Sequence, residues 1–143
     1  MNERHHDSAS VLDWLEHAEQ DLLASESLLE KKNRKLLNPA CYHAQQAAEK
    51  YLKSLLLHLG ITFPFTHDIR LLLELVTEQV KLDVDVADVI SLTRYATQTR
   101  YPGDWEPIDR REATEVLAIA RQLGGQVTAL ISKRRTKDER KRH

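Results

Sequence analysis

Four polar residues recur along one side of the segment CYHAQQAAEKYLKSLLLHLG, residues 41–60, which otherwise consists largely of alanine and leucine. They are His43, Gln46, Lys50 and Lys53, and at about 100° per residue they form one stripe on a helix. Imidazole and ammonium groups on one stripe could form a wall of a binding site. The alternative is an ordinary solvated surface, with intrahelical pairs such as Glu49 with Lys53.

A second polar group, Thr66-His67-Asp68, follows the extended segment ITFPF. Thr66 is a suitable N-cap for a following helix, and Asp68 is favourably placed near the positive end of that helix. Capping alone leaves His67 unexplained. Backbone N–H groups at the start of a helix also suit an anion, so this turn is a second candidate for a binding site.

A third group lies in RYATQTRYPGDW, residues 94–105, where a predicted helix gives way to a loop. Arg94, Arg100 and Tyr101 combine forked cations with a ring, and this combination suits phosphate oxygens and a stacked base. Arg94 follows Ile90 by four residues, so it could equally extend over the edge of the apolar face.

Common catalytic and metal-binding motifs are absent from the sequence. It has no glycine-rich phosphate loop, no CxxC, no HExxH and no GxSxG. His5 and His6 stand near the N-terminus, and no set of residues has the spacing of a zinc site. We therefore expect no metal, no cofactor and no catalytic residue of these classes.

The apolar residues that must position these groups recur at helical spacing throughout. No stretch alternates for long enough to predict a strand, so the predicted fold is an all-α, up-and-down bundle of about five helices. Gly124 and Gly125 fall inside the last helix, where each costs about 1 kcal/mol relative to Ala, and they indicate a bend or a close helix crossing. The first two predicted helices cover about residues 10–31 and residues 38–60, the second with Asn38 as N-cap and Pro39 in its first position. A third helix is capped by Thr66, and a fourth runs from Val86 and ends before Pro102. The last helix begins at Asp109 and Glu112, which have capping-box spacing.

Length and composition fit one globular domain. The chain has 143 residues, of which 41% are hydrophobic and 30% charged, enough for a single core. We expect one domain over residues 1–143, with a core at about 10–132. Residues 133–143 carry seven Lys or Arg against two acids, so this basic tail could contact nucleic acid or an acidic partner, or simply remain in solvent.

The location of the protein can also be predicted. Cys41 is the single cysteine and lies on the apolar side of a predicted helix, which favours a reducing compartment. No apolar run approaches the roughly 18 residues that span a bilayer, and the first ten residues lack the apolar stretch of a signal peptide. We expect a cytoplasmic protein.

The order and spacing of three motifs resemble the HEPN domain family, named for nucleotide-binding domains of higher eukaryotes and prokaryotes. The motifs are the Ala-Ala-Glu-Lys box at 47–50, the Thr-His-Asp turn at 66–68 and the Arg-Tyr-Pro corner at 100–102. The resemblance covers about Leu12 to Leu130. It implies a helical bundle that commonly dimerises, and members are often encoded beside a minimal nucleotidyltransferase as halves of a toxin–antitoxin system. It also implies nucleotide-facing positions, which are Lys50, Lys53, His67, Arg94, Arg100 and Tyr101.

Three hypotheses follow for the function. The first is a nucleotide-binding or regulatory HEPN subunit that forms a homodimer and works with a minimal nucleotidyltransferase. The second is a metal-independent ribonuclease toxin, in which His43 or His67 donates a proton and Arg100 holds the phosphate. The family's ribonucleases carry an Arg followed after four to six residues by a His, and this sequence lacks that motif. The third is a helical dimer whose polar patches contact another protein.

The dimer is expected because the second and last helices carry a surplus of apolar residues.

Overall fold

The computed structural model describes residues 9–96 and 107–141, with side chains up to Lys133. Within these residues the chain is all α-helical, with no strand, which confirms the predicted fold class. The elements are α2 (Val11–Glu30), the short 3-10 helix η1 (Arg34–Leu36), α3 (Leu37–His58), α4 (Ile69–Thr77), α5 (Val86–Ser91), the 3-10 helix η2 (Leu92–Tyr95) and α6 (Arg110–Lys141).

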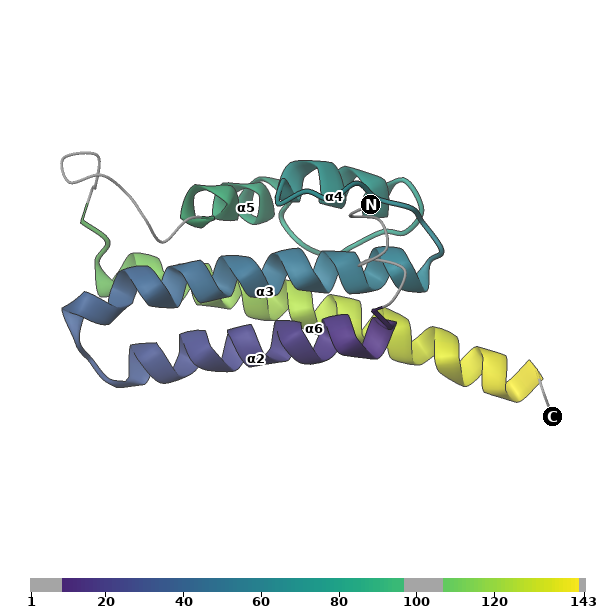
Figure 1. The fold of residues 1–143 in the computed structure, drawn as a ribbon, viewed down its shortest axis with the longest axis horizontal. Coiled ribbons are helices and arrows are strands. Elements are labelled where there is room, and N and C mark those ends of the chain that lie inside the picture. Colours follow the sequence, from purple (N-terminus) through teal and green to yellow (C-terminus); the bar gives the residue numbers. More distant parts are fainter. Residues whose placement is uncertain (1–8, 97–106, 142–143) are drawn as a thin grey trace.

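Helix α3 is the centre of the bundle. Figure 1 shows α2 and α6 on one side of α3, and α4 and α5 on the other, with α2 antiparallel to α3. Because α3 is covered from both sides, its small and branched residues Ala44, Ala48, Leu52 and Leu55 are completely buried. Any polar residue of α3 that points between its neighbours must therefore find a partner inside the protein.

Helix α2 begins where the sequence predicts, at a complete capping box. The Ser10 hydroxyl accepts from the backbone N–H of Asp13, and the Asp13 carboxylate accepts from the N–H of Ser10. These bonds hold the pKa of Asp13 below its usual value, since they stabilise the carboxylate.

Two predicted N-caps are wrong by a few residues. Asn38 lies inside α3, because the 3-10 turn η1 leads directly into this helix, and Asn33 caps that turn instead. Thr66 does not cap α4; Asp68 does, and its carboxylate accepts from the N–H groups of Arg70 and Leu71. Thr66 instead supports the cap, since its hydroxyl accepts from the N–H of Asp68.

Helix α6 starts with half of the predicted capping box. The Asp109 carboxylate accepts from the N–H of Glu112 at 2.8 Å. The Glu112 carboxylate does not return to the cap; it accepts from the hydroxyl of Tyr95 at 2.5 Å. This second bond ties the end of η2 to the start of α6.

The glycine pair in α6 marks a close helix crossing. A Cβ atom at Gly124 would lie 2.6 Å from the ring of Tyr51 on α3, whereas a Cβ at Gly125 would meet nothing. The helix continues through both residues without a break. Gly124 therefore allows α6 to approach α3 closely. Of the two predicted alternatives, a bend or a close helix crossing, the structure shows the crossing.

The basic tail is a continuation of α6. The helix runs to Lys141, and Figure 1 shows its last turns extending past the end of the bundle. No helix of the described residues is long and apolar enough to cross a membrane.

Exposed large hydrophobic side chains are not where the sequence predicts them. Those in the described part of the chain are Leu12 and Leu23 of α2, Phe65 and Val86. Most large apolar residues of α3, and of α6 up to Lys133, pack in or against the core instead. Leu12 and Leu23 are 11 residues apart, which places them within about 20° of each other around α2.

Candidate functional site

Two carboxylates organise the polar stripe of α3. The first is Asp21, which reaches across from α2. One of its oxygens lies 2.9 Å from Nδ1 of His43, and the other lies 2.5 Å from Nζ of Lys50. The Asp21 side chain is only 13% exposed, so this carboxylate is largely shielded from water. Asp21 thus fixes two residues of the stripe in place.

The second carboxylate is Glu49, which is more deeply buried. Its Oε1 lies 2.7 Å from Nδ1 of His67, and its Oε2 lies 3.9 Å from Nζ of Lys53. The side chains of Glu49 and Lys53 are 2% and 4% exposed, respectively, whereas that of His67 is 65% exposed. The predicted intrahelical pair of Glu49 and Lys53 is therefore confirmed, but it lies inside the protein instead of on a solvated surface.

The ammonium group of Lys53 sits close to two aromatic rings. Its Nζ is 5.4 Å from the ring centre of Trp14 and 5.9 Å from that of Phe65. Burial lowers the pKa of Lys53, while the neighbouring Glu49 acts in the opposite direction. The two rings face the cation with their π-electrons and offset part of its lost hydration.

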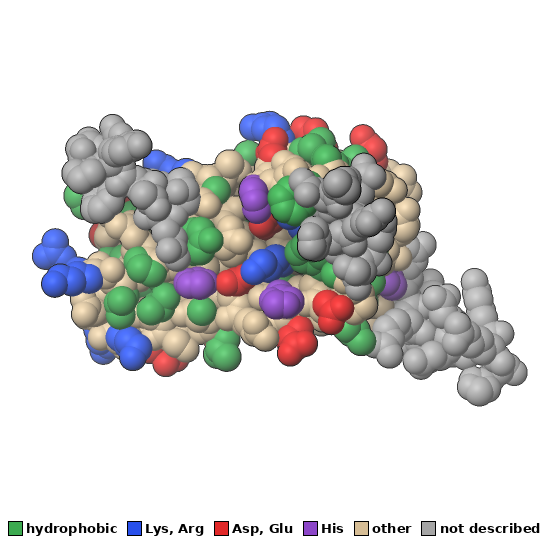
Figure 2. All heavy atoms as spheres, in the orientation of Figure 1, with side chains coloured by type: hydrophobic (Ala, Val, Ile, Leu, Met, Phe, Trp, Pro, Cys, Tyr) green, Lys and Arg blue, Asp and Glu red, His purple; other side chains and the backbone are tan. Residues whose placement is uncertain are grey.

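We call this surface the α3 face and define it by eight residues, which are Trp14, Asp21, His43, Glu49, Lys50, Lys53, Phe65 and His67. Glu49 and Lys50 are neighbours in sequence, so the two carboxylate centres lie side by side on α3. Figure 2 shows histidine, acidic and lysine side chains gathered over the middle of this helix.

The carboxylates determine how the two histidines can act. An ionised carboxylate can only accept a hydrogen bond, so Nδ1 of both His43 and His67 must be the donor. This leaves Nε2 of each ring for a proton or a ligand. The arrangement can hold an imidazole in a fixed orientation, beside a lysine that can contact an anion.

The structure brings together three of the six predicted nucleotide-facing residues. Lys50, Lys53 and His67 share the α3 face. Arg94 lies elsewhere: its guanidinium covers the ring of Tyr95 at 5.8 Å, and Tyr95 is bonded to Glu112 at the start of α6.

The length of α3 separates the α3 face from Arg94 and Tyr95. Tyr95 lies near Cys41 of α3; burial raises the pKa of its phenol, and Glu112 and Cys41 act in the same direction. Lys53 is twelve residues further along α3, a rise of about 18 Å. Arg100 and Tyr101 are outside the described residues, so their predicted role stays a prediction.

Sequence reasoning missed three members of the α3 face, and one of them left a signal. Asp21 stands at helical spacing between Ala18 and Ser25, which are both buried. That spacing points Asp21 toward α3 and could have predicted its burial. Trp14 and Phe65 lie far apart in sequence, and their meeting at Lys53 depends on how the segment after α3 folds back.

Metal binding has no support at this site. Among the residues that the structure describes, no three His, Cys, Asp or Glu side chains are grouped so that they could hold a metal ion. The imidazoles of the α3 face are each paired with a single carboxylate.

The protein is a helical bundle whose central helix α3 carries the buried carboxylate of Glu49. This carboxylate is paired with Lys53 of the same helix and with His67 from the turn before α4. The HEPN domain model matches residues 11–127. The chain belongs to the HEPN domain family.

Two solved structures resemble the chain over most of its length. TT1696 from Thermus thermophilus is 32% identical, with a TM-score of 0.64 over 83% of this chain and 96% of that chain. ST0689, described as an archaeal HEPN homologue, is 25% identical, with a TM-score of 0.62 over 86% of this chain and 98% of that chain. No curated protein matches.

Proposed function

We propose that the chain is a nucleotide-binding or regulatory HEPN subunit and that the α3 face holds the ligand. The observation that carries this proposal is the position of Lys53, whose ammonium lies 5.4 Å from the ring centre of Trp14 and 5.9 Å from that of Phe65. Phe65 is 57% exposed and the Lys50 side chain is 25% exposed, so the Phe65 ring can stack on a base while Lys50 contacts phosphate oxygens.

The charges of the α3 face favour a nucleotide over a simple anion. The carboxylates of Asp21 and Glu49 are matched by the ammonium groups of Lys50 and Lys53. A small anion such as sulfate gains little from a site whose charges already balance. A nucleotide adds stacking, which is worth about 1–3 kcal/mol per base.

A fluorescence titration tests this site, because Trp14 is part of it. Trp105 is the second tryptophan, so a Trp105→Phe variant reports Trp14 alone. We expect ATP to change the Trp14 emission with saturation, and Phe65→Ala or Lys50→Gln to weaken binding at least several-fold.

The matched control is Lys81→Gln, which removes an exposed lysine outside the α3 face. Both Phe65 and Lys50 are at least partly exposed, so their variants should fold. An unchanged affinity in both would rule out the α3 face as the nucleotide site.

The proposed partners are a second copy of the chain and a minimal nucleotidyltransferase. The HEPN family membership supports both, and the exposed Leu12 and Leu23 of α2 give a surface that association would cover. Light scattering should give twice the 16.5 kDa of one chain. Co-expression with a nucleotidyltransferase encoded beside the chain's gene should yield a complex; elution of the two proteins as separate species would contradict the partnership.

A ribonuclease toxin is the second candidate, and one observation favours it. His43 and His67 each direct Nδ1 to a carboxylate, the orientation that leaves Nε2 available for proton transfer. Incubation of concentrated protein with RNA in EDTA tests it. Cleavage that disappears in His43→Gln and His67→Gln would establish this function, and intact RNA would eliminate it.

A further inference from the structure

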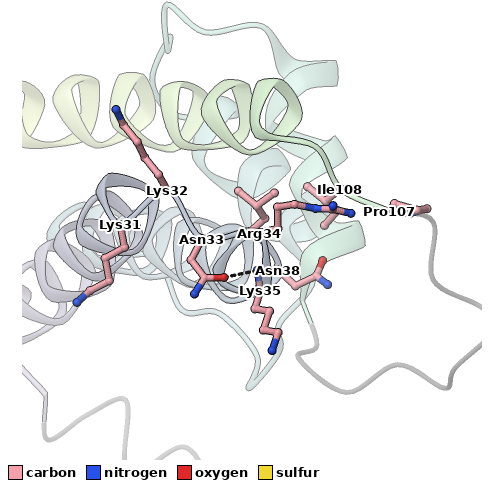
Figure 3. Close-up of a pocket in the computed structure, with 9 residues that line it drawn as sticks. Lys31, Lys32, Asn33, Arg34, Lys35, Asn38, Pro107 and Ile108 are labelled. Carbon is pink, nitrogen blue, oxygen red and sulfur yellow. Dashed lines mark hydrogen bonds between the residues drawn. The ribbon is translucent and has the colours of Figure 1, made fainter.

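A cavity of about 810 Å³ opens at the turn between α2 and α3, away from the α3 face. Its walls come from residues 31–35, which we call the basic turn, from the start of α3, and from Pro107 and Ile108 before α6. Figure 3 shows Arg34 extending toward Pro107 and Ile108, while the ends of the lysines point outward in different directions.

The basic turn concentrates positive charge. Its sequence is KKNRK, and all five residues are exposed. The cavity is lined by four cations, Lys31, Lys32, Arg34 and Lys35, and an acidic residue, Asp109, lines only the adjoining pocket. Within the described residues none of these four forms an ion pair with a carboxylate. The described residues therefore form a positively charged surface here.

Helix electrostatics explains only part of this cluster. Lys31 follows the last turn of α2, where a cation stabilises the negative end of the helix. Arg34 and Lys35 lie in η1, directly before α3. At the positive end of a helix a cation is unfavourable, so these two residues are not there to stabilise α3.

The backbone at Lys32 gives a second reason to infer a function. Its φ is 54°, and it is the one non-glycine residue with a positive φ in the described residues. Glycine would adopt this left-handed conformation without steric cost. The chain thus carries a cation at a position where stability favours glycine.

We propose that the basic turn is a docking surface for the phosphate backbone of a single-stranded nucleic acid. The cations are spread around a cavity and point in different directions, so they can neutralise successive phosphates more readily than a single one. No aromatic side chain lines the cavity, so the proposed contacts are to phosphates and include no stacking on a ring of the cavity.

This docking surface is separate from the proposed nucleotide site. Asn38 at the cavity and Lys50 of the α3 face are twelve residues apart on α3, or about 18 Å. A nucleic acid strand could bind at the turn whether or not a nucleotide binds at the α3 face.

Fluorescence anisotropy with a labelled oligouridylate, measured over a series of salt concentrations, tests the proposal. For single strands the logarithm of the binding constant falls with the logarithm of the salt concentration by about 0.7 per neutralised phosphate. Lys32→Gly should make this slope shallower by about 0.7. Replacing Lys31, Lys32, Arg34 and Lys35 together by Gln should make it shallower by about 2.8, four times as much.

Lys32→Gly also separates binding from folding. Because glycine suits the backbone at this position, the melting temperature of the variant should rise while its affinity for the oligouridylate falls. The comparison is always with the wild type, since the basic tail can add its own contribution to the slope.

Lys81→Gln is the matched control, with the same change in charge. The neighbouring Asp83 contacts Gln126, which is sixteen residues, or about 24 Å, along α6 from Arg110 beside the cavity. The control should leave the slope unchanged. An unchanged slope in the four-residue variant, or an equal loss in Lys81→Gln, would overturn the proposal.

Two competition experiments identify the occupant. Polyglutamate should displace the oligouridylate poorly, and displacement at equal charge concentration would assign the surface to an acidic polypeptide and overturn the nucleic-acid proposal. Saturating ATP should leave the oligouridylate bound. In Phe65→Ala the oligouridylate should also stay bound, so failure of the proposed nucleotide site is distinguishable from failure of this one.

Discussion

Nδ1 of His67 lies 2.7 Å from Oε1 of Glu49, and this bond joins an exposed imidazole to a carboxylate that is 2% exposed. Glu49 is also the charged partner of the buried Lys53. The bond therefore connects the turn before α4 to an ion pair within α3. A ligand that contacts His67 would therefore change the hydrogen bonding of the Glu49 carboxylate, which compensates the charge of Lys53.

Replacing Glu49 by Gln should strongly destabilise the protein. The change leaves the ammonium of Lys53 buried without its carboxylate, and such a loss typically costs about 3–5 kcal/mol. His67→Gln removes only an exposed partner and should cost less than about 1 kcal/mol. Urea denaturation of the two variants measures the difference, and equal costs would mean that Lys53 does not depend on Glu49.

The glycine pair of α6 offers a matched comparison. Gly124→Ala places a methyl group 2.6 Å from the Tyr51 ring and should cost about 1–3 kcal/mol through overpacking. Gly125→Ala meets open space and should stabilise the helix by about 0.5–1 kcal/mol.

A double-mutant cycle with Tyr51→Leu checks the cause. If the ring is responsible, Gly124→Ala should cost less in that background. A cost that does not change would place the conflict elsewhere.

Tyr51 should make stability depend on alkaline pH. Burial raises the pKa of its phenol to about 12, from an ordinary value of 10. The folded chain keeps this proton where the unfolded chain loses it, so the stabilisation is complete below pH 10 and is lost as the pH rises from 10 to about 12. In Tyr51→Phe the free energy of unfolding should fall less over this interval. Denaturant titrations at several pH values measure it, and parallel losses in both proteins would contradict the assignment.

The cap of α4 is Asp68, whereas the sequence predicts Thr66. Asp68 accepts from two N–H groups of the first turn, so Asp68→Ala should cost about 1 kcal/mol. Thr66 accepts one bond, from the N–H of Asp68, outside the helix. Thr66→Val should cost less than Asp68→Ala in thermal denaturation, and the reverse order would restore Thr66 as the cap.

The apolar residues recur every three or four positions, and this period predicts the helices well with one exception. The helix predicted from Val86 to just before Pro102 is an α-helix only to Ser91, and the chain tightens into the 3-10 helix η2 from Leu92 to Tyr95. The same period predicts the start of α2 at about Ser10. The glycine pair predicts a bend or a close crossing, and the structure shows the close crossing, at Gly124 alone. The cap of α3 was missed because Asn33 and η1 extend the helical path upstream of Asn38. Several residues could serve as caps here, and tertiary packing selected among them.

The α3 face was only half predictable. The spacing of Lys50 and Lys53 identified the stripe, but whether a lysine is solvated depends on the elements that cover it. Lys53 is buried because Trp14 and Phe65 reach it from distant parts of the chain. The basic turn is not predictable for another reason: exposed cations are common on protein surfaces, and only the cavity and the backbone at Lys32 distinguish this cluster.

A calorimetric titration of the purified protein with ATP, beside inorganic sulfate as the anion control, tests the central claim most directly. The stacking and lysine contacts of the α3 face predict saturable binding of ATP, little binding of sulfate, and a clear loss of ATP affinity in Phe65→Ala. Equal binding of ATP and sulfate, or no binding of either, would contradict a nucleotide site formed by this chain alone.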